Sequence, residues 1–431
     1  MTTIYKQTFA NGFTLLAEPM EWLESVAYRL AIPAGTSLEP TDRAGLAGFT
    51  CEMVLRGAGE RSSQQVIDDF DRLGIHRDET VGAAFTQYCG STLTECLDAS
   101  LELIADLARR AHLPKQELEW SRTSGLQELR AMEDEPSDRV AVEMRKRAFS
   151  VPWNRIPQGT VEGYTAIQLR DIRRFYETFY RPNGAILAVA GRFQWKTLLD
   201  QVAKLFGDWK PLQEPKIETK PPLWKCARIP APEATQTQIG FAWRSVPSNH
   251  PDYPLAWGLT NILSGGMSSR LSTTMRERNG LCYSVNASQL GTFDEGLVFG
   301  QLGTSPEQET TAITLFREVL AQLGKDGTNR DSLRVIGGAI REDEVVRLKT
   351  RAKAALLMQQ ESSAAHAASL VSDWYLFGRT RTAEEVLQLV ESLDAKRLNA
   401  FVPQYVPAEE SLLTVTLGPE LASTESDCDG L

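Results

Sequence analysis

The sequence has few cysteines, and they form no pattern. Six are scattered over 431 residues without a Cys-x-x-Cys pair or a regular spacing. Secreted disulfide scaffolds instead show dense, evenly paired cysteines. We therefore expect reduced thiols and no disulfide scaffold. The six are Cys51, Cys89, Cys96, Cys226, Cys282 and Cys428.

Long apolar runs are also missing. No stretch reaches the roughly 20 apolar residues that a membrane-spanning helix needs. Residues 1–18 alternate polar and apolar side chains around Asn11-Gly12, which predicts a β-hairpin and lacks the apolar centre of a secretion signal. These absences predict a cytoplasmic protein with no membrane partner.

Basic residues are fewer than acidic ones. The chain has 46 Lys and Arg residues against 56 Asp and Glu residues, so its formal net charge is -10. Phosphate backbones and anionic lipid surfaces repel a protein of this sign. We expect no nucleic-acid partner.

The length and the prolines indicate two domains. Hydrophobic residues make up 42% and charged residues 24%, the balance of a globular protein, and 431 residues are enough for two cores of about 200 residues each. Between residues 208 and 222 four prolines alternate with charged residues and prevent a continuous helix. We predict an N-terminal domain at residues 1–210, a linker at 211–222 and a C-terminal domain at 223–431.

Each predicted domain has the order of an α+β fold. A strand-rich beginning, at residues 26–32 and again at 235–243, precedes helical stretches. Residues 185–190 form a short apolar run that is typical of a buried strand. The predicted helices are Ser63 to Leu73, Leu97 to Ala111, Lys115 to Met132, Ala166 to Phe179, Ala256 to Leu263, Thr310 to Leu323 and Asp343 to Met358.

One offset relates two pairs of segments. A shift of 226 positions places residues 129–132 over 355–358, and the same shift places residues 172–179 over 398–405 with apolar side chains aligned. A shared offset favours an internal duplication. Two unrelated amphipathic helices are the alternative for the first pair, in which only the methionine is identical.

Residues 45–53 read Gly-Leu-Ala-Gly-Phe-Thr-Cys-Glu-Met. This run resembles the start of the catalytic helix in the insulinase and pitrilysin family of zinc peptidases, where the pattern is Gly-Leu-Ala-His-x-x-Glu-His-Met. The resemblance implies two homologous α/β-sandwich halves, each an antiparallel-rich sheet packed with helices. Length fits the bacterial branch related to the mitochondrial processing peptidase. Further matches are Arg181-Pro182-Asn183, Gly265-Gly266, Ser269-Arg270-Leu271, Arg276-Glu277 and Gly280-Leu281-Cys282-Tyr283.

The zinc motif itself is altered at every position. In His-x-x-Glu-His, two histidines four positions apart on a helix face one zinc ion, and the glutamate reaches the metal-bound water. Gly48 stands at the first histidine position, Cys51 at the glutamate position and Glu52 at the second histidine position. Glu128 stands where the resemblance implies the third ligand. Catalytic zinc needs three protein ligands, so we expect no metal or other cofactor in this chain.

Other chemistry at these positions has to be weighed. Thiolate and carboxylates do bind zinc, but glutamates without an imidazole more often pair with arginines, such as Arg56 or Arg130. A cysteine nucleophile needs a base, and no histidine lies in a motif with Cys51. The four histidines are His76, His112, His250 and His366.

The second half keeps two residues that the resemblance implies are functional. In the family an arginine and a tyrosine seven positions later hold the peptide carbonyl, and Arg276 and Tyr283 have that spacing. Both side chains donate hydrogen bonds, which stabilise a developing oxyanion. The alternative is a surface ion pair for the arginine and a packed tyrosine.

Peptide binding has two further candidate elements. The turn at Gly265 and Gly266 allows close backbone approach, because glycine has no Cβ, although an ordinary loop explains it equally well. An edge strand pairs with an extended peptide through its backbone, and residues 84–90 and 284–289 are the candidates.

These observations predict an inactive, zinc-less subunit of a heterodimeric metallopeptidase. Its homologous partner would carry the zinc, and its substrate would be a peptide. The alternative is a stand-alone peptide-binding or scaffold protein, alone or as a homodimer. A hydrolase of another kind is a third hypothesis, for which no complete set of nucleophile and base is present.

Overall fold

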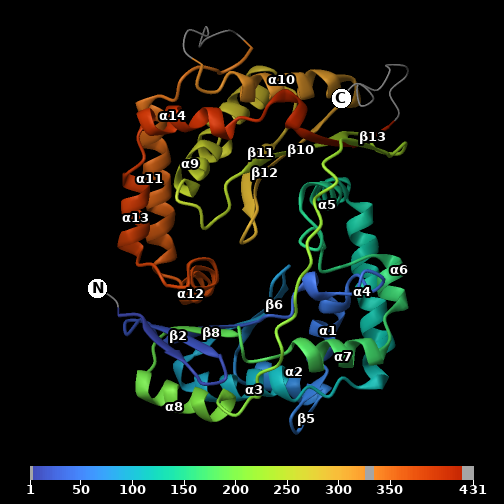
Figure 1. Cartoon of the computed structure of the whole chain (residues 1–431), viewed down its shortest axis with the longest axis vertical. Coiled ribbons are helices and arrows are strands. Elements are labelled where there is room, and N and C mark those ends of the chain that lie inside the picture. The colour runs from blue at the N-terminus through green and yellow to red at the C-terminus, as the bar shows by residue number, and fades with distance from the viewer. Residues whose placement is uncertain (1–2, 326–333, 420–431) are drawn as a thin grey trace. The chain divides into compact units, whose positions relative to one another are not determined.

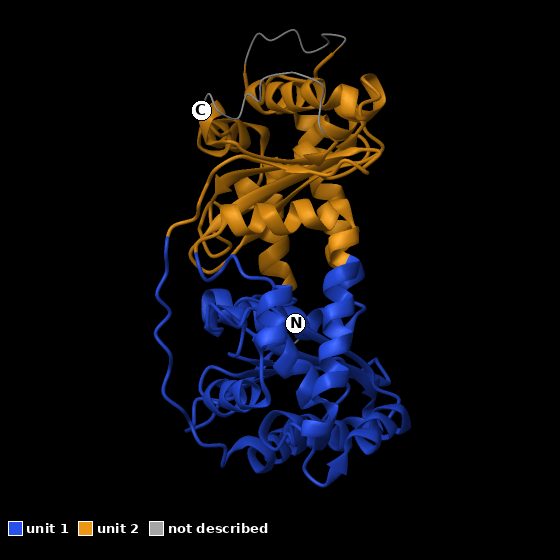
Figure 2. Cartoon of the chain, turned by 90° about the vertical axis from the view of Figure 1, so that its right-hand side faces the viewer, with its two compact units in different colours: residues 1–131, 151–220, 357–381 blue, residues 132–150, 221–356, 382–431 orange. Residues whose placement is uncertain are grey.

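The computed structural model describes residues 3–325 and 334–419, and its backbone crosses repeatedly between two units. Unit 1 comprises residues 1–131, 151–220 and 357–381, and unit 2 comprises residues 132–150, 221–356 and 382–431 (Figure 2). The units differ from the predicted division at 211–222 in two places. Residues 132–150 of the first half belong to unit 2, and residues 357–381 of the second half belong to unit 1. Cys428 lies outside the described residues.

Unit 1 is built on a six-stranded sheet in the order β1-β2-β8-β3-β7-β6, in which only β2 and β8 pair in parallel (Figure 1). The predicted hairpin is confirmed as β1 and β2, and Gly12 at its turn has φ +84°. The predicted buried strand is β8, central in the sheet. The strands are β1 (Tyr5–Thr8), β2 (Thr14–Pro19), β3 (Ser25–Ile32), β6 (His76–Val81), β7 (Thr86–Leu93) and β8 (Ile186–Gly191).

Helices surround this sheet, and a small hairpin of β4 (Gly57–Ala58) and β5 (Arg61–Ser62) lies beside them. Helix α4 begins in unit 1 and ends in unit 2. The helices are α1 (Leu46–Val54), α2 (Ser63–Arg72), α3 (Leu97–Arg109), α4 (Leu118–Asp134), α6 (Val161–Ala166), α7 (Leu169–Phe179), α8 (Trp195–Phe206) and α12 (Ser363–Phe377).

Unit 2 has a five-stranded sheet in the order β11-β12-β10-β13-β9, in which only β9 and β13 pair in parallel. Its strands are β9 (Ala227–Pro230), β10 (Thr237–Ser245), β11 (Val285–Gly291), β12 (Gly296–Thr304) and β13 (Leu413–Gly418). Its helices are α5 (Pro136–Ala148), α9 (Tyr253–Ser264), α10 (Glu309–Ala321), α11 (Glu342–Gln359, ending in unit 1), α13 (Ala383–Glu391) and α14 (Ala395–Tyr405).

Each sheet is covered on one face by a helix from the other half of the chain. In unit 2, Val140 and Met144 of α5 pack against β10, where a Cβ on Gly240 would lie 2.7 Å from Val140. In unit 1, Leu370 of α12 packs against a cluster that includes Leu16 of β2. The opposite face of the unit 2 sheet packs against α9, α10 and α14.

The internal duplication is visible in the elements. A shift of 226 positions carries α7 onto the full range of α14, and it carries α4 onto α11 and β8 onto β13 within two residues. Both segments that suggested the repeat therefore lie in corresponding helices. The chain has the predicted α+β fold of two similar α/β halves.

The predicted linker has no helix or strand between residues 209 and 226, apart from one bridge at Lys220. Its first part is held on unit 1 by Asn183, whose amide exchanges hydrogen bonds of 2.9 and 3.0 Å with the backbone of Leu212. Among the described helices, none is long and apolar enough to cross a membrane.

A buried ion pair fixes α12 on its sheet and predicts a pH effect on stability. The Nδ1 atom of His366 lies 2.7 Å from Glu18 of β2, and this hydrogen bond raises the pKa of His366 above its ordinary value of 6.5. A histidine whose pKa is raised by folding stabilises the fold fully at pH values below its pKa in the unfolded chain. This stabilisation is lost as the pH rises through its pKa in the folded chain.

We expect His366→Gln to lower the urea midpoint more at roughly pH 5.5 than at roughly pH 8.5. The exposed His76 provides the matched control, because His76→Gln removes a histidine that forms no ion pair among the described residues. An equal loss at both pH values in His366→Gln would show that the pair does not titrate in this range.

Candidate functional site

Helix α1 carries the altered zinc motif, and a buried carboxylate sets its N-terminus. Glu39 accepts hydrogen bonds from the backbone N–H groups of Gly45 and Ala47 at 3.2 and 2.8 Å. Burial raises the pKa of Glu39 to about 7, against the lowering effect of these two bonds and of Arg155. The start of the helix, including Gly45 at φ +95°, is thus fixed by its own loop.

At the first motif position the structure has no space for a side chain. A Cβ on Gly48 would lie 2.5 Å from the carbonyl oxygen of Pro157, closer than real Cβ contacts come. That oxygen belongs to the backbone, so no side-chain rotation relieves the clash. Loop 151–160 itself is held by Arg155, which donates to the carbonyls of Thr36 and Glu39. The first ligand position is therefore blocked as well as empty of donors.

The second and third motif positions are also committed to other partners. Glu52 forms an ion pair with Arg56 one turn later, as the sequence predicted. Cys51 is buried, and desolvation raises the pKa of its thiol to about 12, although a hydrogen bond with Tyr88 opposes this. A thiol with this pKa is protonated at neutral pH and is neither a nucleophile nor a ready metal ligand.

All four predicted positions nevertheless come together. Gly48, Cys51, Glu52 and Glu128 line one pocket in unit 1 with a volume of about 370 Å³. Glu128 accepts a hydrogen bond of 3.1 Å from the amide of Gln158. The sequence thus identified residues of α1 and α4 that share one pocket.

The residues in this pocket do not fit the family's zinc ion. One ligand position lacks a donor and is occupied by backbone, a second is bound by arginine, and no histidine is among the lining residues. Within residues 3–325 and 334–419, no group of three His, Cys, Asp or Glu side chains could hold a metal ion. The described side chains of this pocket therefore do not supply the three zinc ligands of the family.

Restoring the motif should not restore the metal. We expect the triple variant Gly48→His, Cys51→Glu, Glu52→His to bind no stoichiometric zinc, measured by metal analysis after dialysis. The Cβ at position 48 should also cost about 1–3 kcal/mol in unfolding free energy through overpacking.

Two single variants separate these effects. Gly48→Ala adds the same Cβ and should be destabilised, whereas Gly82→Ala should not, because its added Cβ would meet only Phe85 at 3.7 Å. One zinc ion per chain in the triple variant would mean that loop 151–160 moves aside, contrary to this account.

The pocket also contains residues that the sequence did not reveal. Glu79 and Tyr164 line it, the first from β6 and the second from α6. The Tyr164 ring stacks on Phe49 of α1, with centroids 4.6 Å apart and planes at 1°. Neither residue belongs to a motif, so only the packing of β6 and α6 around α1 identifies them.

In unit 2, the predicted arginine and tyrosine are neighbours. The Arg276 guanidinium lies 5.4 Å from the centroid of the Tyr283 ring, and its Nε lies 3.3 Å from Glu277. Arg276 belongs to a π-helical segment, Ser272–Arg278, and the Tyr283 side chain is 87% exposed. The arginine is in the predicted surface ion pair, but the tyrosine is exposed, unlike a packed core residue.

The glycine turn of unit 2 is covered by an arginine. A Cβ on Gly265 would lie 2.6 Å from Arg351 of α11, and one on Gly266, at φ +158°, would lie 3.3 Å from the same guanidinium. Arg351 therefore occupies the space that the missing Cβ atoms of the two glycines leave free. A peptide at this turn would have to displace it.

The edge-strand candidates have different outcomes. Of the candidate at 84–90, residues 86–90 belong to β7, which pairs with β3 and β6, so this candidate was wrong and β6 is the edge on that side. Residues 284–289 overlap β11, which is an edge strand. However, the N–H of Ala287 donates to Ser264 of α9 at 2.6 Å, so part of that edge is already paired.

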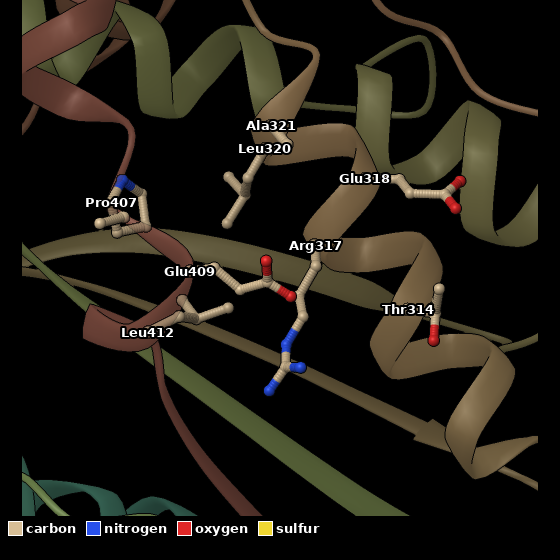
Figure 3. A pocket seen from close by; sticks show the side chains of 9 residues that line it. Thr314, Arg317, Glu318, Leu320, Ala321, Pro407, Glu409 and Leu412 are labelled. Atoms are coloured by element: carbon tan, nitrogen blue, oxygen red, sulfur yellow. The ribbon is translucent and has the colours of Figure 1, made fainter. Parts of the chain in front are cut away.

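A different pocket in unit 2 contains none of the predicted residues (Figure 3). It lies between α10 and residues 407–412, and its volume is about 250 Å³. Leu320 and Leu412 line it together with Arg317 and Glu409. The sequence motifs therefore do not lead to this pocket.

Comparison with known proteins agrees with the motifs. The family model "Insulinase (Peptidase family M16)" matches residues 18–152, and "Peptidase M16 inactive domain" matches residues 166–336. A Bacillus subtilis protein named "Uncharacterized zinc protease YmxG" is 24% identical over 420 residues, which are 96% of this chain and 98% of that protein.

Two solved structures show the same fold. A protein from Pseudomonas fluorescens, described as a peptidase M16 inactive domain, superposes with a TM-score of 0.86 at 20% identity, covering 98% of this chain and 99% of that one. A protease from Helicobacter pylori superposes with a TM-score of 0.85 at 20% identity, covering 97% of this chain and 100% of that one. The two family models, matched in order along a chain of this fold, show that the protein belongs to the insulinase family, peptidase family M16.

Proposed function

We propose that this chain is the zinc-less subunit of a two-subunit metallopeptidase. The observation that carries the proposal is the contact at Gly48, where the Pro157 carbonyl fills the space of the first zinc ligand. A chain that merely lost one ligand would keep that space, whereas here the loop has closed over it. The catalytic metal would belong to a homologous partner with an intact His-x-x-Glu-His motif.

The contribution of this chain would be hydrogen-bond donors. Arg276 and Tyr283 form an exposed cation-π pair, and among the described residues the arginine forms an ion pair only with its neighbour Glu277. A guanidinium and a phenol aimed at a peptide carbonyl stabilise the oxyanion that forms during hydrolysis. Neither group activates water, so this role requires the partner's metal.

Backbone pairing would hold the substrate in an extended form. Strand β6 is an edge of the unit 1 sheet, and Glu79, Thr80 and Val81 at its end line the pocket. Main-chain hydrogen bonds to an edge strand give affinity with little sequence dependence. We place the complex in the cytoplasm, because the scattered cysteines form no disulfide framework and suit a reducing compartment.

The test is reconstitution. A homologous subunit with His-x-x-Glu-His, taken from the same source, should co-purify with this chain, and mixing the two should give chelator-sensitive peptidase activity that neither shows alone. Chelator-sensitive cleavage by this chain in isolation would refute the proposal.

The same experiment examines the alternative of a stand-alone peptide-binding protein. The preserved pocket in unit 1 favours binding of some ligand even without chemistry. In that case no zinc-bearing subunit co-purifies, and Arg276→Ala leaves the biological activity unchanged.

A further inference from the structure

The pocket at the altered zinc motif presents one face of α4. Ser121, Gly125 and Glu128 follow each other at spacings of four and three residues, which places them on the same side of a helix. Glu52 of α1 and Glu79 of β6 line the same space. The pocket is thus open, polar and rich in acceptors, although no metal-binding group of three side chains forms among the described residues.

One buried hydroxyl group in this pocket has no hydrogen-bond partner among the described residues. Ser121 is fully buried and its Oγ is unpaired. Tyr164 is 5% exposed, and its hydroxyl lies where a Cβ on Gly125 would be 2.2 Å away. Buried polar groups are paired in the great majority of folded proteins, so the unpaired Ser121 hydroxyl indicates a missing ligand in this pocket.

The charges in the pocket identify the sign of that ligand. Glu52 is paired with Arg56, and Glu79 accepts a hydrogen bond of 2.9 Å from Arg77. Among the described residues, Glu128 accepts a hydrogen bond from the neutral amide of Gln158 and forms no ion pair. One carboxylate therefore remains without a cation, and a ligand with a single positive charge would balance it.

We propose that this pocket binds the side-chain ammonium group of a lysine in a peptide. An ammonium group has three N–H donors and no acceptor, which matches the Glu128 carboxylate and the hydroxyl oxygens of Ser121 and Tyr164. The ammonium is a compact point charge, unlike the wide planar fork of arginine. The inference deepens the proposed function by naming the peptides that the subunit holds, and it does not require the zinc-bearing partner.

The test is calorimetric titration of the full chain alone with acetyl-Gly-Gly-Lys-Gly-Gly-amide and with its norleucine analogue. The lysine peptide should bind at least about tenfold more tightly, and Glu128→Gln should abolish the difference. Glu133→Gln removes the same charge from an exposed position of α4 and should preserve it. Circular dichroism melting confirms that both variants are folded.

Ser121→Ala provides a second variant that should fold normally, because its hydroxyl makes no hydrogen bond. It should weaken the lysine peptide severalfold and leave the norleucine peptide unchanged. A norleucine peptide with a free amino terminus tests the other source of an ammonium group, and preferential binding of that peptide would overturn the assignment to lysine.

Equal binding of the two acetylated peptides, no binding of either, or unchanged binding in Glu128→Gln would each overturn the inference. These outcomes are separate from failure of the proposed function, which is measured as activity after mixing with the zinc-bearing subunit. A mixture that is active but indifferent to lysine would reject the inference and retain the proposed function.

Discussion

Replacing Arg276 with alanine should lower kcat/KM of the reconstituted two-subunit peptidase by about 10²–10³-fold, because one donor to the developing oxyanion is lost. The effect should fall mainly on kcat, since the charge that the arginine stabilises develops in the transition state. Steady-state kinetics with a fluorogenic peptide measure both constants. Metal content and co-purification should remain as in the wild type, because the role proposed for Arg276 is in the reaction and not in metal binding or subunit association.

Arg347→Ala is the matched control. Arg347 is an exposed arginine of unit 2 in an ion pair with Asp343 at 2.7 Å, comparable to Arg276 with Glu277. It should leave the kinetics unchanged. Tyr283→Phe, which removes only the phenolic hydroxyl, should reduce kcat while preserving the ring under the guanidinium. Activity of Arg276→Ala equal to that of Arg347→Ala would show that the arginine is not a transition-state donor.

Replacing Arg270 with alanine should destabilise unit 2 by about 3–5 kcal/mol, the largest effect on stability that we expect. The Arg270 and Glu344 side chains are 3% and 7% exposed and are joined by two hydrogen bonds of 2.8 Å. The same guanidinium donates to the carbonyls of Gly338 and Ala339. Removing it leaves a carboxylate buried without its cation.

Urea unfolding followed by fluorescence measures this loss. The double variant Arg270→Met, Glu344→Leu should recover part of it, because an apolar pair leaves no buried charge. Arg347→Ala removes a half-exposed ion pair with Asp343 and should cost less than about 1 kcal/mol. A loss for Arg270→Ala no greater than that of Arg347→Ala would mean that water reaches Glu344.

Local patterns predicted the elements well where a period or a turn residue defined them. Residues 169–179 form a helix, as expected from apolar side chains that recur with a period of about 3.6 residues. Residues 186–191 form a buried strand, as expected from a short continuous apolar run. The exchange of α5 and α12 was not predicted. An amphipathic helix shows which side it buries, but its sequence does not say which of two similar sheets will cover that side.

The edge-strand error has the same origin. Residues 84–90 read as a strand, and they form one, but β6 adds to its outer side and takes the edge position. Strand order depends on pairing between distant segments, which period and composition do not encode. The pairing of Ala287 with Ser264 on β11 is likewise a long-range contact.

By itself the sequence showed Gly48, Cys51 and Glu52 at the positions that the family resemblance assigns to the zinc motif, because ligand chemistry depends on the identity of side chains. Only the tertiary structure decided what surrounds these positions: the Pro157 carbonyl lies beside Gly48, and Ser121, Tyr164 and Glu128 line one pocket, in which the Ser121 hydroxyl is unpaired. The physical reason is that occupied space and unpaired charge arise where segments from α1, α4, β6 and loop 151–160 meet. No single segment carries that information.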